Sequence, residues 1–128
     1  MMDLPFNSEQ KKKFITNVGL ITSYGKHGQN VMAAEWVHQV SYSPGLIAVC
    51  INPSRATADN IKETKEFGVN LAAGDQNVIV SIAGRDSAHM TDKVKALQEL
   101  GYKFVPGKKI KALMIEGSAM QAECKLIE

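Results

Sequence analysis

Most of the chain is divided into short apolar segments by glycine, proline and asparagine, and this punctuation limits it to short strands and short helices. The clearest segment is residues 120–126, where apolar and polar side chains alternate with the period of two that is typical of a half-buried strand. Residues 46–51 form a continuous apolar run that is too short for a helix, and we expect a fully buried strand there. A strand at residues 14–24, a turn at 25–28 and a returning strand at 29–37 predict a hairpin.

Two helices are expected between the strands. The first covers residues 56–66, because Ser54 is a preferred N-cap residue and Gly68 is a suitable C-terminal stop. The second covers residues 92–100 and stops at Gly101.

The remaining segments complete an α+β pattern. Residues 67–72 and 111–116 read as further strands. Residues 76–83 contain Val, Ile and Val in succession, which favours a strand by propensity, but a short helix is equally compatible with this segment. The order is mainly antiparallel β with two or three inserted helices, which predicts a β-barrel with short helices.

The length and charge limit the range of functions. A chain of 128 residues predicts a single domain spanning residues 1–128. The net charge of +2, from 15 basic and 13 acidic residues, gives no reason to expect a nucleic-acid partner or a membrane surface. The apolar stretch at residues 15–21 is shorter than the roughly 20 residues that span a bilayer, and the N-terminus does not resemble a signal peptide. Cys50 and Cys124 lack the spacing of a redox pair, so we expect a reducing, cytoplasmic location.

The sequence carries no catalytic motif of its own. It has no glycine-rich dinucleotide fingerprint after a strand, no P-loop and no G-x-S-x-G nucleophile elbow. The three histidines are not spaced for zinc, and no cysteine pair accompanies them. We therefore expect no catalytic side chain and no metal, and infer that any redox chemistry would be carried by a cofactor.

A first candidate for holding a cofactor is the segment at residues 30–36. Small side chains at Ala33 and Ala34 would let the backbone approach a flat ring, and Trp36 could pack against the ring or its sugar chain. The alternative is that both alanines fill the barrel interior and Trp36 belongs to the core. The segment taken by itself favours this alternative.

A second candidate lies where a strand ends and the first helix begins. A helix N-terminus offers unpaired amide hydrogens and a positive dipole end. Ser54 and Thr57 add hydroxyl groups, and Arg55 adds a cation that can bind phosphate through two hydrogen bonds. The alternative is an ordinary helix cap beside a solvated arginine.

Taken together, these segments resemble the flavin reductase-like family, and most closely its flavoredoxin branch. The resemblance runs from about residue 14 to residue 128 and depends on the order and spacing of its segments rather than on one motif. The matching segments are residues 17–23, 29–36, 40–49, 55–61, 66–71, 84–86, 92–93, 115–116 and 123–124.

The resemblance implies an FMN-binding split β-barrel that holds flavin non-covalently near the interface of a homodimer. The residues expected to meet the isoalloxazine and ribityl parts are Asn30, Met32, Ala33, Ala34 and Trp36. Those expected to hold the phosphate are Ser54, Arg55 and Thr57. Lys93 matches a downstream lysine of the family, whose charge suits the phosphate or the reduced flavin. Without the resemblance, Lys93 would read as an exposed helix lysine.

The sequence departs from the family pattern at three places. Glu35 stands where relatives usually carry a small polar residue, which places a negative charge near the expected ring. Gly45 replaces the second proline of a common Pro-Pro pair. Family members also usually continue beyond the equivalent of Glu128 through further strands with a Gly-Asp-His segment, so the domain is expected to be short at its C-terminus.

Three functions follow from the resemblance. The leading one is reduction of FMN by NADH or NADPH. The second is a flavoredoxin-like electron carrier that passes electrons between protein partners. The third is a shortened, non-catalytic family member that forms a dimer but binds flavin weakly or not at all.

Overall fold

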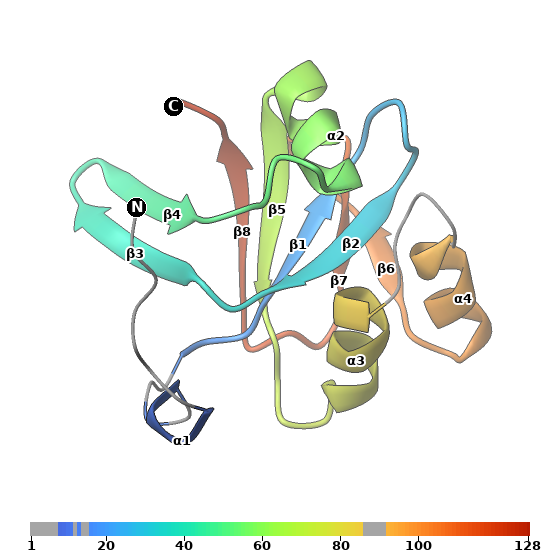
Figure 1. The fold of residues 1–128 in the computed structure, drawn as a ribbon. Helices are drawn as coiled ribbons and strands as arrows, with labels where there is room; N and C mark the ends of the chain where they lie inside the picture. Colours follow the sequence, from blue (N-terminus) through green and yellow to red (C-terminus); the bar gives the residue numbers. More distant parts are fainter. Residues whose placement is uncertain (1–7, 12, 14–15, 86–91) are drawn as a thin grey trace.

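A four-stranded antiparallel sheet forms the centre of the molecule, in the order β2-β1-β5-β8 (Figure 1). The computed structural model describes residues 8–11, 13, 16–85 and 92–128. The strands of the sheet are β1 (Gly19–Ser23), β2 (Asn30–Ala34), β5 (Glu66–Leu71) and β8 (Met120–Lys125). The predicted α+β class, mainly antiparallel with short helices, is confirmed.

The N-terminal hairpin predicted from the sequence is confirmed, with shorter strands. β1 and β2 pair antiparallel, with Gly19 opposite Ala34 and Ser23 opposite Asn30. The turn between them contains Gly28, whose φ of +70° lies in the left-handed region that favours glycine. Residues 14–15 of the expected first strand lie outside the described residues.

The two faces of the sheet are covered by different elements, because side chains alternate along each strand. One face contributes Leu20 and Val31 to a core shared with helices α3 (Asn77–Arg85) and α4 (Lys93–Glu99). The other face contributes Ile21 and Val69 to a second core. Helix α2 (Ala56–Thr64) and the β3–β4 hairpin pack on this second side (Figure 1).

Helix α2 confirms the predicted helix but not its caps. Arg55 is the N-cap residue and its side chain makes no capping hydrogen bond, whereas the backbone N–H and hydroxyl of Ser54 both donate to Asn52 Oδ1. Helix α2 ends at Lys65, which adopts φ = +60° and donates its backbone N–H to the carbonyl oxygen of Ile61. The predicted stop at Gly68 is wrong, since this residue lies within β5.

The other helical segments also follow the sequence in type. Residues 76–83, which were compatible with strand or helix, fall largely within α3. The predicted helix at residues 92–100 is confirmed as α4, with the Asp92 carboxylate accepting a capping hydrogen bond from the N–H of Lys95. A further helix, α1, spans Ser8–Lys11.

Two smaller antiparallel hairpins flank the sheet. β6 (Phe104–Pro106) pairs with β7 (Leu113–Ile115), and β3 (Val37–Tyr42) pairs with β4 (Gly45–Val49). The β3–β4 hairpin extends away from the rest of the fold as an arm (Figure 1). The prediction of a fully buried strand at residues 46–51 is wrong, because β4 contains only exposed and half-buried residues. Among the described residues, no helix combines the length and apolar content that a bilayer crossing requires.

Candidate functional site

The structure brings two of the predicted site residues, Asn30 and Thr57, into direct contact. Asn30 begins β2 and Thr57 lies in the first turn of α2, and both are almost completely buried. Asn30 Nδ2 donates a hydrogen bond to Thr57 Oγ1 over 3.0 Å. Because the hydroxyl oxygen accepts this bond, the hydroxyl hydrogen remains available for a second partner. The contact fixes the start of α2 against the edge of the central sheet.

The N-terminus of α2 next to this pair is suited to an anion. Arg55 is exposed and provides no side-chain cap. The first turn of a helix leaves backbone N–H groups without intrahelical partners, and the helix dipole is positive there. Ser54 is exposed and donates its hydroxyl hydrogen to Asn52 Oδ1, a bond that the hydroxyl would exchange to bind an anion. Amides, a hydroxyl and a guanidinium group are the donors that phosphate oxygens prefer.

The small side chains of β2 point to opposite faces of the sheet. Ala33 packs in the core with α3, where a Cβ built on Gly84 would lie only 3.3 Å from the Ala33 methyl group. Ala34 is 5% exposed and belongs to the other core, as does the half-buried Met32. One flat ring therefore cannot lie against both alanine side chains, and the packing role of the alanines is present in the structure.

Trp36 is not a core residue. It lies between β2 and β3 with 60% of its surface exposed, while its backbone carbonyl accepts a hydrogen bond from the N–H of Cys50 over 3.1 Å. The neighbouring Glu35 is also exposed and accepts a hydrogen bond from the Thr16 hydroxyl over 3.3 Å. The indole and the carboxylate are thus both accessible where β2 ends.

Lys93 is not an exposed helix lysine. It is the first residue of α4 and only 4% exposed, and its ammonium group donates to the carbonyl oxygen of Ala83 over 3.2 Å. This contact joins α4 to the C-terminal part of α3, where the helix dipole favours a positive charge. Lys93 therefore lies on the α3–α4 side of β2, whereas Arg55 and Thr57 lie on the α2 side.

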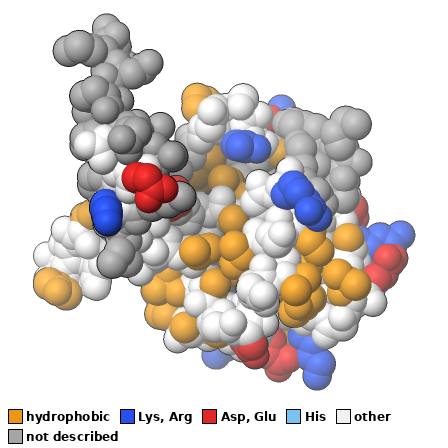
Figure 2. All heavy atoms as spheres, turned by 60° about the horizontal axis from the view of Figure 1, so that its bottom comes forward, with side chains coloured by type: hydrophobic (Ala, Val, Ile, Leu, Met, Phe, Trp, Pro, Cys, Tyr) orange, Lys and Arg blue, Asp and Glu red, His pale blue; other side chains and the backbone are white. Residues whose placement is uncertain are grey.

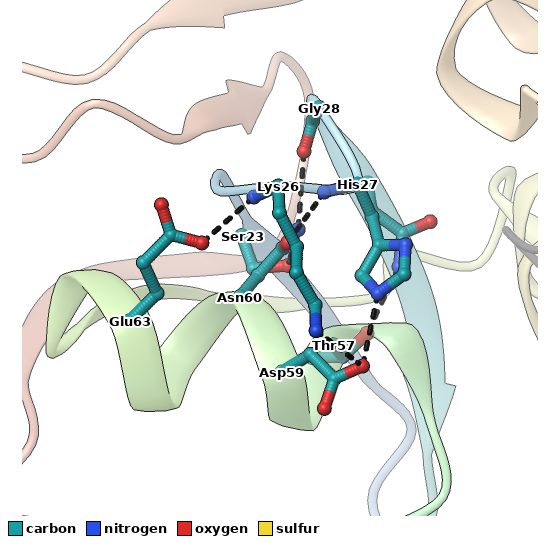
Figure 3. Close-up of polar contacts among 9 residues, drawn as sticks. Ser23, Lys26, His27, Gly28, Thr57, Asp59, Asn60 and Glu63 are labelled. Carbon is teal, nitrogen blue, oxygen red and sulfur yellow. Dashed lines mark hydrogen bonds and ion pairs between the residues drawn. The ribbon is translucent and has the colours of Figure 1, made fainter.

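A buried polar group beside Asn30 and Thr57 was not predicted from the sequence. Asn60 is completely buried and its amide makes three hydrogen bonds, to Ser23 and to two residues of the turn at residues 25–28 (Figure 3). The signal that could have revealed it is the spacing of Thr57 and Asn60, which lie three residues apart and so share one face of the helix. In the sequence, Thr57 is a predicted phosphate-binding residue, whereas Asn60 reads as an ordinary polar position of a surface helix.

Charged side chains hold the outer part of the same turn on α2 (Figure 3). His27 Nε2 lies 2.9 Å from Asp59 Oδ2, and Lys26 Nζ lies 3.7 Å from the same oxygen. The hydrogen bond from His27 is the main cause that holds the pKa of Asp59 below its ordinary value, and the charges of Lys26, His27 and Lys62 act in the same direction while burial opposes them.

We expect the stabilising effect of Asp59 to disappear in acid. Its lowered pKa means that the folded state favours the ionised carboxylate, so the contribution is complete above the unfolded pKa of about 4 and is lost as the pH falls through the lower folded pKa. Urea unfolding of the wild type and Asp59→Asn should therefore differ at pH 7 and converge at low pH. A difference that stays constant with pH would contradict the assignment.

Comparison with known proteins gives a consistent result. The sequence matches the family model for the flavin reductase like domain over residues 11–128. An uncharacterized protein of Pyrococcus abyssi is 32% identical over 104 residues, which cover 80% of this chain and 58% of the relative. The chain therefore spans less than two thirds of that relative's length.

Two solved structures illustrate the similarity of fold. Flavoredoxin of Desulfovibrio vulgaris (Miyazaki F) superposes with a TM-score of 0.81 and 25% identity, covering 100% of this chain and 67% of flavoredoxin. An FMN-binding protein from Thermus thermophilus superposes with a TM-score of 0.83 and 21% identity, covering 100% of this chain and 66% of that protein. The split β-barrel expected from the sequence is confirmed by these likenesses.

Proposed function

The chain belongs to the flavin reductase-like family, and from this premise we propose that it binds FMN non-covalently and reduces it with NADH or NADPH. The observation that carries the proposal is the contact between Asn30 and Thr57 at the start of a helix without a side-chain cap. Next to this contact in the chain lie the amides of the first helical turn and the exposed Arg55. The similarity to an FMN-binding protein supports flavin as the ligand.

The phosphate end of FMN would bind at the N-terminus of α2. Thr57 would donate its hydroxyl hydrogen to a phosphate oxygen while accepting from Asn30, and Arg55 would neutralise the phosphate charge. Ser54 would join the same site by turning its hydroxyl hydrogen from Asn52 Oδ1 to a phosphate oxygen. The chemistry of this donor set fits a doubly charged phosphate.

The ring end would lie along β2 toward Trp36. We propose that Asn30 and Met32 contact the ribityl chain and ring edge, and that Ala33 and Ala34 contribute through their backbone. Trp36 has the exposed surface that stacking on a flat ring requires. In this arrangement, Lys93 would place its positive charge near the flavin from the α3–α4 side of β2.

FMN held by these residues would supply the hydride-transfer redox chemistry. Hydride transfer itself needs no acid or base, so the residues of this chain would bind and orient the two ring systems. This proposal therefore assigns no catalytic side chain and no metal.

The reductase activity can be tested directly with purified protein, FMN and NADH or NADPH. Loss of absorbance of the reduced nicotinamide should proceed faster than in a control without protein. A rate equal to that control for both nucleotides would contradict the reductase proposal.

A flavoredoxin-like electron carrier is the second candidate, and the likeness to flavoredoxin favours it. A carrier would retain its flavin through purification and exchange electrons with a redox protein faster than with NADH. A yellow preparation with flavin absorption would exclude the third possibility, a family member that does not bind flavin.

We also propose that two copies associate through the β3–β4 arm. Val40 is 60% exposed and Tyr42 is 90% exposed, and Trp36, which precedes the arm, is also 60% exposed. The arm and its base therefore present an apolar surface that a two-stranded hairpin cannot bury by itself. Figure 2 shows hydrophobic side chains at the left end of the molecule, where the arm lies, and over the adjoining face, with Lys and Arg side chains among them. Sedimentation velocity at micromolar concentration should give the mass of a dimer, and a monomer there would contradict this proposal.

The proposed setting is the cytoplasm, without a nucleic-acid or membrane partner. Cys50 and Cys124 are free thiols, which suits a reducing compartment.

A further inference from the structure

The side-chain amide of Asn60 makes three hydrogen bonds at the junction of the β1–β2 turn with α2 (Figure 3). Asn60 Oδ1 accepts from the backbone N–H of His27 over 3.1 Å. Asn60 Nδ2 donates to Ser23 Oγ over 3.2 Å and to the Gly28 carbonyl oxygen over 3.1 Å. The residue is 0% exposed; its hydrogen bond to Ser23 is buried, and those with His27 and Gly28 are partly buried. Loss of the amide would leave buried groups without partners, which is costly.

The turn approaches the helix closely enough to require this contact. A Cβ built on Gly25 would lie 2.8 Å from Asn60 Oδ1 and 2.9 Å from Asn60 Cα, so only glycine fits there. The N–H of Gly28 donates to the Gly25 carbonyl oxygen over 2.8 Å and closes the turn. On the exposed side, the N–H of Lys26 donates to Glu63 Oε2 over 2.9 Å. The turn is therefore bound to α2 from both sides.

Four side chains then form a cross-linked set between the strands and the helix. Ser23 and Asn30 are opposite one another in the β1–β2 register. Thr57 and Asn60 lie one helical turn apart on α2. Asn30 bonds to Thr57 and Asn60 bonds to Ser23, so two hydrogen bonds tie this strand pair to this helix face. A shift in the contact between Asn60 and Ser23 would therefore change the geometry of the contact between Asn30 and Thr57.

We propose that Asn60 is a positioning residue that sets phosphate recognition by Asn30, Thr57 and Arg55. Asn60 does not touch the flavin; it fixes the separation of β2 and α2, and with it the direction of the Thr57 hydroxyl. The inference rests on the proposed binding of FMN. It predicts that Asn60 governs the preference for FMN over riboflavin, which lacks the phosphate.

The test compares FMN and riboflavin titrations, followed by flavin fluorescence, for the wild type and Asn60→Ala. The ratio of the two affinities should fall about tenfold in the variant, because FMN is weakened and riboflavin is nearly unaffected. Ser23→Ala removes only one of the three hydrogen bonds, so it should lower the ratio in the same direction by a smaller factor. It also keeps the test valid if Asn60→Ala does not fold.

Thr64→Ala is the matched control on the same helix. The Thr64 hydroxyl donates to two backbone carbonyl oxygens, that of Asn60 over 3.0 Å and that of Glu66 over 3.5 Å. This variant should lower the melting temperature but leave the FMN-to-riboflavin ratio unchanged. A similar fall of the ratio in Thr64→Ala, or equal losses for both flavins in Asn60→Ala and Ser23→Ala, would overturn the positioning role.

Hydrogen exchange of the flavin-free protein provides a second readout. The backbone amide of His27 should exchange faster in Asn60→Ala than in the wild type, and unchanged protection would overturn the inference. A wild-type chain that binds neither flavin would contradict the proposed function itself. Wild-type binding with an unchanged ratio in Asn60→Ala would contradict only the role of Asn60.

Discussion

Replacing Arg55 with alanine should weaken FMN binding by about 10- to 100-fold and leave riboflavin binding nearly unchanged. The guanidinium group is exposed at the start of α2 and makes no capping bond, so its removal should not disturb the helix. A hydrogen bond to a charged group contributes about 1.5–3 kcal/mol, and only FMN has the phosphate to receive it. Fluorescence titration of both flavins measures the difference.

Two further variants make this result specific. Arg55→Lys keeps the charge but loses the planar, two-pronged donor, so its effect should lie between those of wild type and Arg55→Ala. Trp36→Ala should weaken FMN and riboflavin alike, because the two ligands share the ring that the indole would contact. Equal weakening of both flavins by Arg55→Ala would mean that Arg55 does not face the phosphate.

Replacing Gly68 with alanine should lower the free energy of unfolding by about 2–3 kcal/mol. Gly68 lies in the middle of β5, where a Cβ would come 2.2 Å from Thr22 Oγ1 and 2.6 Å from Met114 Sδ. The methionine side chain can shift, but the β-branched threonine is buried and has little rotamer freedom. Urea unfolding with an unchanged slope would report the loss as stability alone.

Gly45→Ala provides the matched control. Gly45 also lies in a strand, and a Cβ built on it meets nothing within 4 Å. We expect this variant to unfold within about 0.5 kcal/mol of the wild type. A comparable loss in both variants would show that the cost comes from removing a strand glycine rather than from crowding at Gly68.

Much of the central sheet follows from local sequence pattern. The alternation at residues 120–126 predicts β8, because a strand with one face on a core needs a period of two. The glycines at residues 25 and 28 mark the β1–β2 turn for a physical reason, since one must approach the helix closely and the other adopts a positive φ. These features depend on neighbours in the sequence or on a single strand face.

The sequence-based predictions are wrong where contacts in the folded protein, rather than the residue type, determine the environment of a segment. The apolar run at residues 46–51 has the composition of a buried strand, but among the strands that the structure describes β4 pairs with β3 alone, in a hairpin that extends from the molecule. Ser54 has the chemistry of an N-cap, but the Asn52 side chain receives its hydrogen bonds. In both cases the residue type is compatible with two environments, and tertiary structure selects between them.

The candidate site is predictable only in part, because some of its residues are neighbours in the sequence and others meet only in the folded structure. The residues at the start of α2 are neighbours in the sequence, so Ser54, Arg55 and Thr57 could be grouped by inspection. Thr57 and Asn30 are 27 residues apart in the sequence, so their contact could be identified only from the folded structure. The burial of Lys93 and the alternate directions of Ala33 and Ala34 also depend on which helices cover each face of the sheet.

The position of β5 between β1 and β8 has a kinetic consequence. Gly68 pairs with Thr22 on one side and with Glu123 on the other, so the middle of the sheet joins segments that are widely separated along the chain. Closing such long loops costs entropy before any pairing is gained, and folds dominated by non-local pairs mature in about milliseconds to seconds. The β1–β2 hairpin can form early from local contacts, but on a ribosome β5 must wait for β8 to emerge before its second edge is covered.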